Sequence, residues 1–216
     1  MIKALFYIAL IISVICISCS KSNNPNPEAS KTSLWPLKYG NSWTYTDSVF
    51  SDSSLSTAYL DTAVILKTPI TDDAGNVYLE VYNPNGWFGS GSYFSVDPSN
   101  TFINGYDSAS GSAYLFFQIA GQDGTLVGNG TDFSNPTCPV TDNQYGFAST
   151  TTIKGYNCYK NIEINTNCNG VALETTVTYV AQGVGVVRIE DYVADSTKNN
   201  AIYLDYSQTL DSATIN

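Results

Sequence analysis

Histidine is absent from this 216-residue chain, and arginine occurs once, as Arg188. Without an imidazole the chain lacks the means for Ser-His-Asp or Cys-His nucleophilic systems, His-ligated zinc and imidazole general bases. One arginine is too little for an anion clamp. The site chemistry that remains is that of carboxylates, tyrosine, lysine or Ca²⁺.

Basic residues are also scarce, because 9 Lys and Arg stand against 19 Asp and Glu. The formal net charge is −10 at pH 7. A surface of this charge repels phosphate backbones, so we expect no nucleic-acid partner. Solubility alone is a sufficient explanation of the charge.

The start of the chain has the three parts of a secretory signal. Residues 1–3 are short and positive, residues 4–17 are mostly apolar, and the small Ser18 precedes Cys19. The apolar run has 14 residues. Crossing a bilayer as a helix takes ~20 residues, so a permanent transmembrane anchor is the weaker interpretation. We expect residues 1–18 to be a signal peptide.

The sequence "ISVICISCS" (12–20) resembles the lipobox of bacterial lipoproteins, although Cys16 stands at −3 in place of Leu or a similar aliphatic residue. The resemblance implies cleavage after Ser18 and a diacylglycerol on the Cys19 sulfur, often with acylation of the new α-amine. Two or three fatty chains hold a protein stably on a membrane. Cys19 is therefore expected to be a lipid tether in the cell envelope, at the outer membrane facing the periplasm or cell surface. A plain apolar leader with incidental cysteines is the alternative.

Residues 19–33 are rich in Ser, Asn, Pro and Lys, with almost nothing apolar to bury. Such a composition is typical of a flexible spacer. Residues 34–216 are long enough for one domain with its own core. This domain contains Cys138, Cys158 and Cys168, which in an oxidising compartment leave one disulfide and one free thiol, with three pairings open.

Short alternating runs of Tyr, Thr, Val, Ile and Phe, bounded by Gly, Asn, Asp and Pro, predict an all-β domain. Short turns between the runs favour an antiparallel meander, forming a strongly curved sheet as a half-barrel or a sandwich. Residues 121–144 are rich in Gly, Asn and Asp, and we expect an irregular excursion there. The expected strands are 42–50, 57–67, 77–82, 92–96, 101–106, 113–120, 156–165, 171–181, 185–193 and 201–210.

Two ends of the domain resemble a group of uncharacterised bacterial lipoproteins and secreted proteins. The matching stretches are "LWPLKYGNSWTYT" (34–46), "GYNCYKNIEI" (155–164) and "YVAQGVGVVRIEDY" (179–192). The resemblance implies a curved all-β sheet and an envelope location, and it brings no established reaction. The recurrent positions that it maps onto this chain, all expected to be structural, are Gly40, Trp43, Cys158, Gly183 and Gly185.

The stretch "NPNGWFGSGSYF" (83–94) places four aromatic residues among glycines and asparagines. Aromatic faces on such a loop could stack on a sugar ring or cover an apolar ligand. A Gly-rich bend whose Trp caps the core is the simpler alternative. The candidate ligand contacts are Trp87, Phe88, Tyr93 and Phe94.

Carboxylates offer two further hypotheses, each with a simpler explanation. Calcium could use the oxygens of Asp72, Asp73 and Asn76, or of Asp123 with Asp132, but turns favour Asp and Asn anyway. A glycosidase needs two facing carboxylates, which Glu80, Glu163, Glu174 and Glu190 could supply, but solvent-facing strand positions explain these residues equally well. We therefore expect no metal, no cofactor and no enzymatic activity.

The sequence thus predicts a membrane-anchored envelope lipoprotein whose β domain binds a glycan or an apolar ligand. The alternative is a structural or assembly partner that acts through a sheet edge on another envelope protein. A concave aromatic face with a pocket favours the first, and a filled interior with a long bare edge favours the second.

Replacing the acylated sulfur tests the predicted tether. We expect Cys19→Ala to abolish incorporation of labelled palmitate and to leave the precursor uncut. A globomycin-type inhibitor of the lipoprotein peptidase should also block cleavage of the unaltered chain. Lipid labelling of the Cys19→Ala protein would contradict the assignment.

Overall fold

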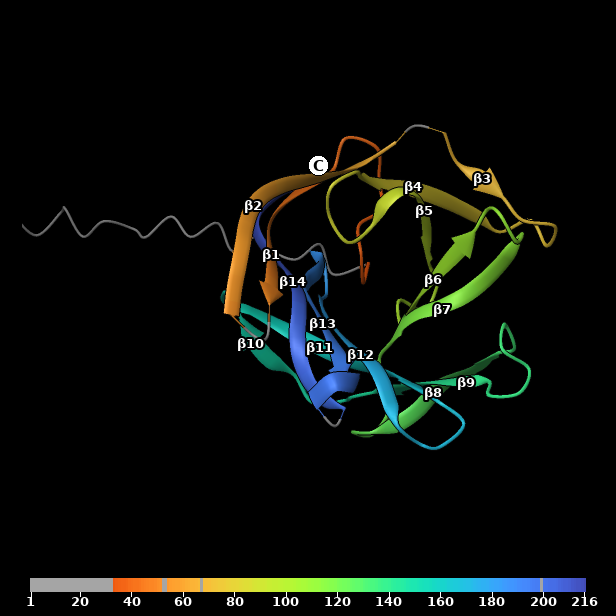
Figure 1. Ribbon diagram of the computed structural model, residues 1–216. Helices are drawn as coiled ribbons and strands as arrows, with labels where there is room; N and C mark the ends of the chain where they lie inside the picture. Colours follow the sequence, from red (N-terminus) through yellow and green to blue (C-terminus); the bar gives the residue numbers. More distant parts are fainter. Residues whose placement is uncertain (1–32, 52–53, 67, 199) are drawn as a thin grey trace, which may run out of the picture.

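The computed structural model describes residues 33–51, 54–66, 68–198 and 200–216 (Figure 1). Cys19 and the predicted signal and spacer up to residue 32 lie outside the described residues. The described chain is all-β, as predicted, with one 3-10 turn, η1 (Ser196–Lys198). The strands are β1 (Ser42–Ser51), β2 (Ser54–Ile65), β3 (Ile70–Thr71), β4 (Val77–Asn83), β5 (Gly89–Val96), β6 (Phe102–Asp107), β7 (Ser112–Gln118), β8 (Thr125–Asp132), β9 (Val140–Gly146), β10 (Thr151–Ile153), β11 (Tyr156–Thr166), β12 (Ala172–Ala181), β13 (Gly185–Asp195) and β14 (Ala201–Thr214).

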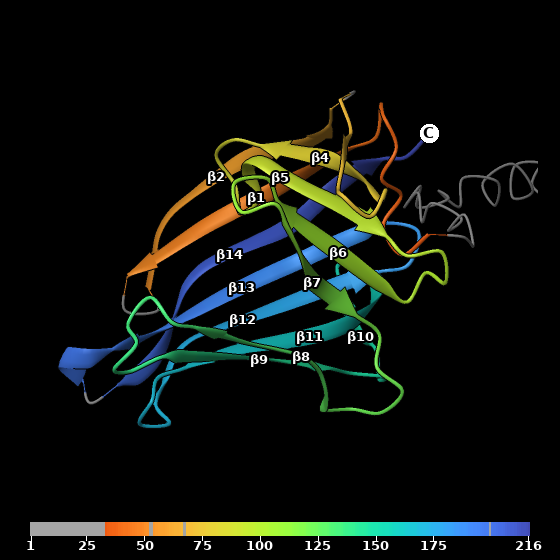
Figure 2. The same ribbon diagram turned by 90° about the vertical axis from the view of Figure 1, so that its right-hand side faces the viewer.

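One antiparallel sheet contains these strands in the order β7-β6-β5-β4-β2-β1-β14-β13-β12-β11-β9-β8, with β3 beside β4 and β10 beside β11. The first and last strands pair in the middle, so the break in the sheet falls between β7 and β8, which follow each other in sequence. The sheet curls until these two edges face each other and nearly closes into a barrel (Figures 1 and 2). The predicted strongly curved meander is confirmed, and we call it the rolled sheet.

The expectation that residues 121–144 are irregular is wrong, because they contain β8 and the start of β9. Gly128 and Gly130 lower the intrinsic strand preference of β8, which is why its pattern is weak. Pairing of β9 with both β8 and β11 supplies the missing order. The disulfide Cys138–Cys168 then ties the β8–β9 turn to the β11–β12 turn, leaving Cys158 as a buried free thiol.

Side chains of β9 and β11, the strands next to β8 in the sheet order, bond to the backbone of the opposite edge strand β7. Gln144 Nε2 on β9 donates to the Phe116 carbonyl oxygen on β7 at 2.8 Å. The backbone N–H of Gln118 donates to Asn161 Oδ1 on β11 at 3.0 Å. Both amides are buried, so these bonds form out of water, where a polar group without a partner is costly. They hold one part of the break closed.

Trp35 fills one end of the rolled sheet. Its ring is fully buried and packs edge-on to Trp43 with 5.8 Å between ring centroids. Trp43 Nε1 donates to the Val184 carbonyl oxygen at 2.7 Å, and Gly183 N–H donates to the Ser33 carbonyl oxygen at 2.8 Å. The segment before β1 is thereby fixed to the β12–β13 turn. Two of the three stretches of the resemblance, 34–46 and 179–192, therefore meet. We call this the Trp35 end.

Gly185 makes this packing fit. A Cβ there would lie 2.0 Å from Trp35 Cδ1, and its φ is +96°, in the region that L side chains avoid. Gly40 has a φ of +92° in the turn before β1. Cys158 is fully buried in the same core. These residues have packing and backbone roles.

Gly185→Ala should therefore destabilise the domain far more than an alanine at another glycine of positive φ. The matched control is Gly155→Ala, since Gly155 has a φ of +87° but nothing within 4 Å of its would-be Cβ. Backbone strain should cost the control about 1–2 kcal/mol. The clash with Trp35 should cost Gly185→Ala about 1–3 kcal/mol more, as measured by urea denaturation. Equal losses would contradict the proposed packing.

Candidate functional site

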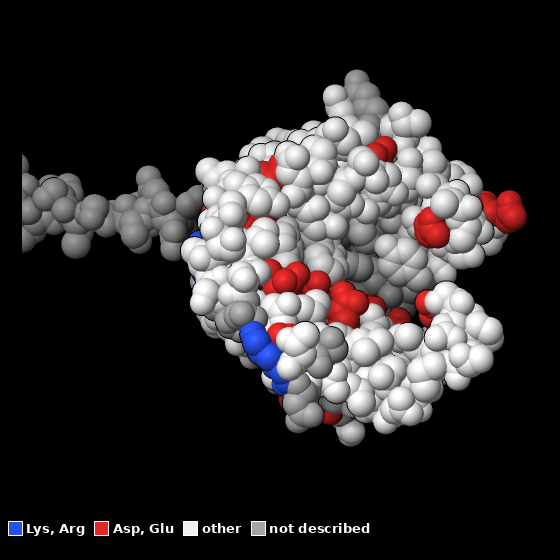
Figure 3. Space-filling model, in the orientation of Figure 1, with Lys and Arg blue, Asp and Glu red and all other residues white. Residues whose placement is uncertain are grey.

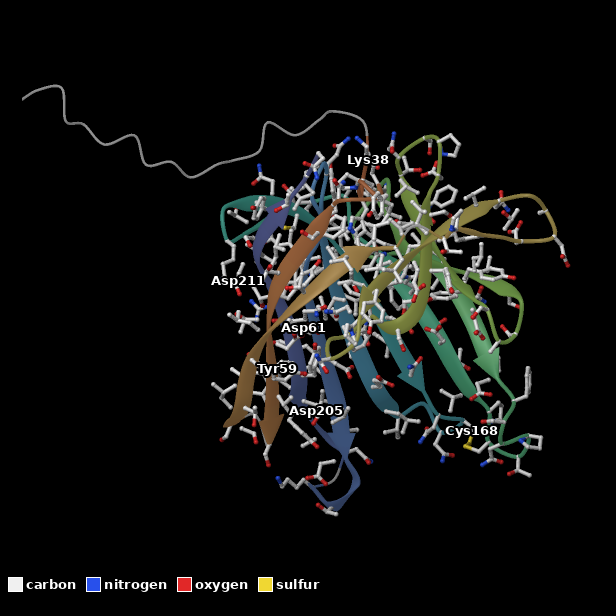
Figure 4. The ribbon with its side chains drawn as sticks, turned by 90° about the horizontal axis from the view of Figure 1, so that it is seen from above. Lys38, Tyr59, Asp61, Cys168, Asp205 and Asp211 are labelled. Carbon is white, nitrogen blue, oxygen red and sulfur yellow. A yellow bond between two sulfur atoms is a disulfide. The ribbon has the colours of Figure 1, made fainter. Side chains whose placement is uncertain are left out.

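The inner face of the rolled sheet changes from apolar to acidic along the strands. At the Trp35 end it presents fully buried apolar side chains such as Trp43 and Val180. Farther along, toward the disulfide at Cys168, the same face carries acidic residues. Figure 3 shows Asp and Glu side chains along a hollow in this region, and Figure 4 places Lys38 and Cys168 at opposite ends of the sheet. The acidic residues on this inner face are Asp47, Asp61, Asp142, Glu163, Glu174 and Asp191.

A cavity of about 330 Å³, which we call the inner cavity, lies between two unlike walls. The aromatic wall comes from the β4–β5 loop, β5 and β7, and the polar wall from β11 and β12. The aromatic wall consists of Trp87, Phe88, Phe94, Tyr114 and Phe116, with Ser92 beside them. The polar wall consists of Glu163, Asn165, Glu174, Thr176 and Thr178.

The structure brings three of the four predicted contact residues to the inner cavity. Phe88 and Phe94 are buried in the core and form its floor, with 5.7 Å between their ring centroids. Trp87 is half-buried and stacks on Tyr206, with 6.0 Å between centroids. Tyr93 precedes Phe94 on β5, so its side chain lies on the opposite face of the sheet. The loop thus turns inward, and whether these residues contact a ligand stays a prediction.

Glu163 and Glu174 occupy adjacent strands of the polar wall. Glu163 is opposite Thr176 in the β11–β12 register, and Glu174 is opposite Asn165, so the two carboxylates are diagonal neighbours. Asn165 Nδ2 donates to Glu174 Oε2 at 3.4 Å. The two carboxylates line one cavity together, an arrangement that sequence reasoning allowed but did not predict.

Burial and neighbouring negative charges raise the pKa values of acidic groups at this wall. Burial raises the pKa of Glu163 to about 7, and the charges of Asp142, Glu174 and Asp191 add to the effect. Burial together with the Glu174 charge raises the pKa of Asp191 to about 6. Glu163 of the polar wall and Asp191 on the neighbouring β13 therefore gain negative charge between about pH 6 and 7.

The other candidate carboxylates lie elsewhere and have local roles. Asp72 accepts hydrogen bonds from Ala74 N, Asn76 N and Asn76 Nδ2 within its own turn. Asp123 accepts from the backbone N–H groups of residues 148 and 149, and Asp132 from Ser134. Among the described residues, no group of three or more Cys, Asp or Glu side chains is placed to hold a metal ion.

Glu80 and Glu190 do not belong to the inner cavity. Glu80 Oε1 accepts from the Gly91 backbone N–H at 3.0 Å. Glu190 Oε1 lies 2.6 Å from Arg188 Nη2, and its other oxygen is near the hydroxyls of Tyr179 and Tyr192. Of the four glutamates considered for catalysis, only Glu163 and Glu174 come together.

A larger groove of about 780 Å³ lies at the Trp35 end. Leu37, Val77, Leu79 and Ile215 give it apolar walls, and Ser33 is at its edge. Ser33 is the first described residue. It contains none of the acidic residues of the inner cavity.

Sequence reasoning did not single out a polar group beneath the β4–β5 loop, formed by the buried Asp47, Asn83 and Gln208 with the half-buried Asp61. The sequence pattern that could have indicated this group is the alternation of residues 42–50, which puts Asp47 on the same face as Trp43 and Tyr45. An acidic residue on an apolar face calls for a partner. Its partner on β14 lies 161 positions along the chain, at Gln208, and no local pattern identifies it.

No family model and no curated protein matches the chain. Among solved structures it is similar to a "putative exported protein with YmcC-like fold" from Bacteroides fragilis, at 12% identity and a TM-score of 0.41. It is also similar to a "putative lipoprotein" from Parabacteroides distasonis, at 13% identity and a TM-score of 0.39. Each comparison covers 85% of this chain and 99% of the other. These TM-scores are too low to bear on function. In the described part of the chain, no helix is long and apolar enough to cross a membrane.

Removing the charge of Glu163 should stabilise the domain at neutral pH. The folded pKa of about 7 lies above the ordinary 4.5, so the proton on Glu163 contributes stability below pH 4.5 that is lost as the pH rises through 7. Glu163→Gln mimics the protonated form. We expect the free energy of unfolding at pH 8 to rise by about 1–2 kcal/mol, with no gain at pH 4.

Urea denaturation at both pH values measures this effect. Asp73→Asn removes one negative charge from an exposed turn position and is the matched control. It should change the free energy of unfolding by less than about 0.5 kcal/mol. An equal gain from both variants would show that net charge, and not the crowded wall, is responsible.

Proposed function

We propose that this chain is a lipid-anchored envelope protein whose inner cavity binds a sugar-class ligand without transforming it. One observation carries the proposal: a single cavity has an aromatic wall on one side and a wall of carboxylate, amide and hydroxyl groups on the other. The lipobox resemblance at Cys19 supports the anchor and the location.

A sugar ring matches both walls. Its C–H face packs on aromatic rings, and its hydroxyl groups donate to carboxylate and amide oxygens. Glu163 and Glu174 supply acceptors, and Thr176 supplies a hydroxyl that acts as donor or acceptor. The volume of about 330 Å³ is at the lower end of ligand-site volumes and suits one or two rings.

A purely apolar ligand is a poorer match for this cavity. An apolar ligand would displace water from both carboxylates, of which only Glu174 accepts a hydrogen bond within the wall, from Asn165, and this desolvation is costly. A sugar supplies several donors at once. The cavity thereby favours the glycan among the two ligand classes that the sequence predicts.

The edge-partner alternative has less support. The two free edges of the rolled sheet, β7 and β8, face each other, and Gln144 and Asn161 already bond to the β7 backbone at Phe116 and Gln118. These bonds use main-chain groups that an added strand would need. The interior contains a cavity instead of being filled.

Binding of a panel of mono- and disaccharides to the mature full-length protein, in a detergent without a sugar headgroup, tests the proposal. Isothermal titration should find at least one saturating saccharide. Trp87→Ala should weaken its binding at least tenfold, since it removes a stacking surface, and Glu174→Gln should weaken it by loss of a charged acceptor.

Tyr93→Ala is the matched control, because Tyr93 is an aromatic residue of the same segment on the other face of β5. Its affinity should stay within twofold of the unaltered protein. If no saccharide of the panel binds saturably, or if Tyr93→Ala weakens binding as much as Trp87→Ala, the inner cavity is not a sugar site.

A further inference from the structure

Two buried polar side chains face each other across β1 and β14. Asp47 and Gln208 are directly opposite in register, and each is 0% exposed. Asp47 Oδ1 accepts a hydrogen bond from Tyr206 Oη. Asp47 Oδ2 and Gln208 Oε1 have no hydrogen-bond partner among the described residues. Two such acceptors left without donors, away from water, are costly.

The remaining hydrogen bonds of Gln208 run in one direction, toward Asp61. Gln208 Nε2 donates to Asn83 Oδ1 at 3.1 Å, and Asn83 Nδ2 donates to Asp61 Oδ2 at 2.8 Å. Asp61 also accepts from the backbone N–H groups of Thr62 and Asn85, at 2.7 and 3.1 Å. Both Asp61 oxygens therefore act as acceptors, and Asp61 is the last acceptor of this group.

Tyr206 connects Asp47 to the loop that carries Trp87. Burial raises the pKa of Tyr206, the hydrogen bond to Asp47 and its charge add to this, and the backbone N–H of Trp87 lowers the pKa. The phenol therefore keeps its proton and donates it toward Asp47. Its oxygen accepts from Trp87, whose ring stacks on the tyrosine.

The β4–β5 loop rests directly on this group of side chains. A Cβ on Gly86 would lie 2.0 Å from Asn83 Oδ1 and 2.5 Å from Gln208 Nε2, so the backbone of the loop covers both amides. Tyr59 Oη donates to the Asn85 carbonyl oxygen at 2.7 Å. Figure 4 shows Tyr59 and Asp61 near each other on the rolled sheet.

We propose that Asp47 carries a proton on Oδ2 in the folded protein and donates it to Gln208 Oε1. One proton then gives both unpartnered oxygens a hydrogen bond. Every donor points the same way, and chains of aligned hydrogen bonds strengthen one another. The chain runs from the Trp87 N–H through Tyr206, Asp47, Gln208 and Asn83 to Asp61.

The charges around Asp47 agree with a neutral carboxyl. Burial raises the pKa of Asp47 above its ordinary 3.8, the Asp61 charge adds to this, and the hydrogen bond from Tyr206 and the polar side chain of Gln208 oppose it. The titratable groups that face it are Asp61 and Tyr59 on β2, Tyr206 on β14 and Tyr45 on β1. The pKa of Asp47 is thus raised on balance, in the direction that a proton on Asp47 requires.

This proton controls the aromatic wall of the inner cavity. Loss of the proton places a negative charge beneath the loop, removes the donor to Gln208 Oε1 and strengthens the hydrogen bond from Tyr206 to Asp47. Stability from the proton is complete below pH 3.8 and is lost as the pH rises through the raised pKa of Asp47. The position of the Trp87 ring against Tyr206 should change over the same pH range. The consequence for ligand binding rests on the proposed function, whereas the proton and the loop movement do not.

Carbon-13 NMR of Asp-labelled, full-length mature protein in detergent micelles tests the protonation directly. The Asp47 carboxyl carbon, assigned by its absence in Asp47→Asn, should titrate above 3.8. Titration of Asp47 at its ordinary value would overturn the proposal.

Fluorescence of Trp87, obtained by subtracting the Trp87→Phe signal, tests the effect on the loop without any ligand. It should change with pH in step with the Asp47 titration. Asp47→Asn supplies a permanent donor to Gln208 and should abolish this pH step, whereas Asp73→Asn, at an exposed turn, should keep it. A step that persists unchanged in Asp47→Asn would overturn the proposal. Absence of sugar binding alongside a normal step would overturn only the proposed function.

Discussion

The contact of the Trp35 ring with the backbone of Gly185 is the constraint on which the rest of the structure depends. It fixes the segment before β1 against the β12–β13 turn, and Trp43 adds its hydrogen bond to Val184. Because β1 also pairs with β14, the beginning and end of the domain are fixed in the middle of the sheet. The break is therefore left at β7 and β8, where the sheet opens.

Filling one end of the rolled sheet with aromatic rings leaves the other end to polar groups. The carboxylates there crowd together, and their mutual repulsion lowers stability at neutral pH. Groups that lower stability locally are typical of functional sites, where the surrounding fold holds the side chains of the site in place. A proton on Asp47 avoids part of this cost. The charge of Glu163, in contrast, lowers the stability of the domain wherever the pH is above about 7.

Prediction from sequence worked where the signal is local. Residues 42–50 show the alternation of a half-buried strand, and β1 is Ser42–Ser51. It failed at 121–144, because the glycines of β8 hide a strand that depends on pairing with β9. For the site, an aromatic cluster could be predicted around Trp87, but the alternation cannot say whether a loop turns outward or into the sheet. Pairing of Asp47 with Gln208 could not be predicted at all.

The sequence alone determined the all-β class and the curved antiparallel meander, because alternation and turn residues act over a few positions. It also placed Cys19 at the end of an apolar run, where we predict the tether. Only the tertiary structure decided which cysteines pair, that Glu163 and Glu174 share one cavity, and that the Trp87 loop lies on a buried hydrogen-bond chain. These features join residues distant in sequence, and their geometry follows from strand register and closure, which no local pattern encodes.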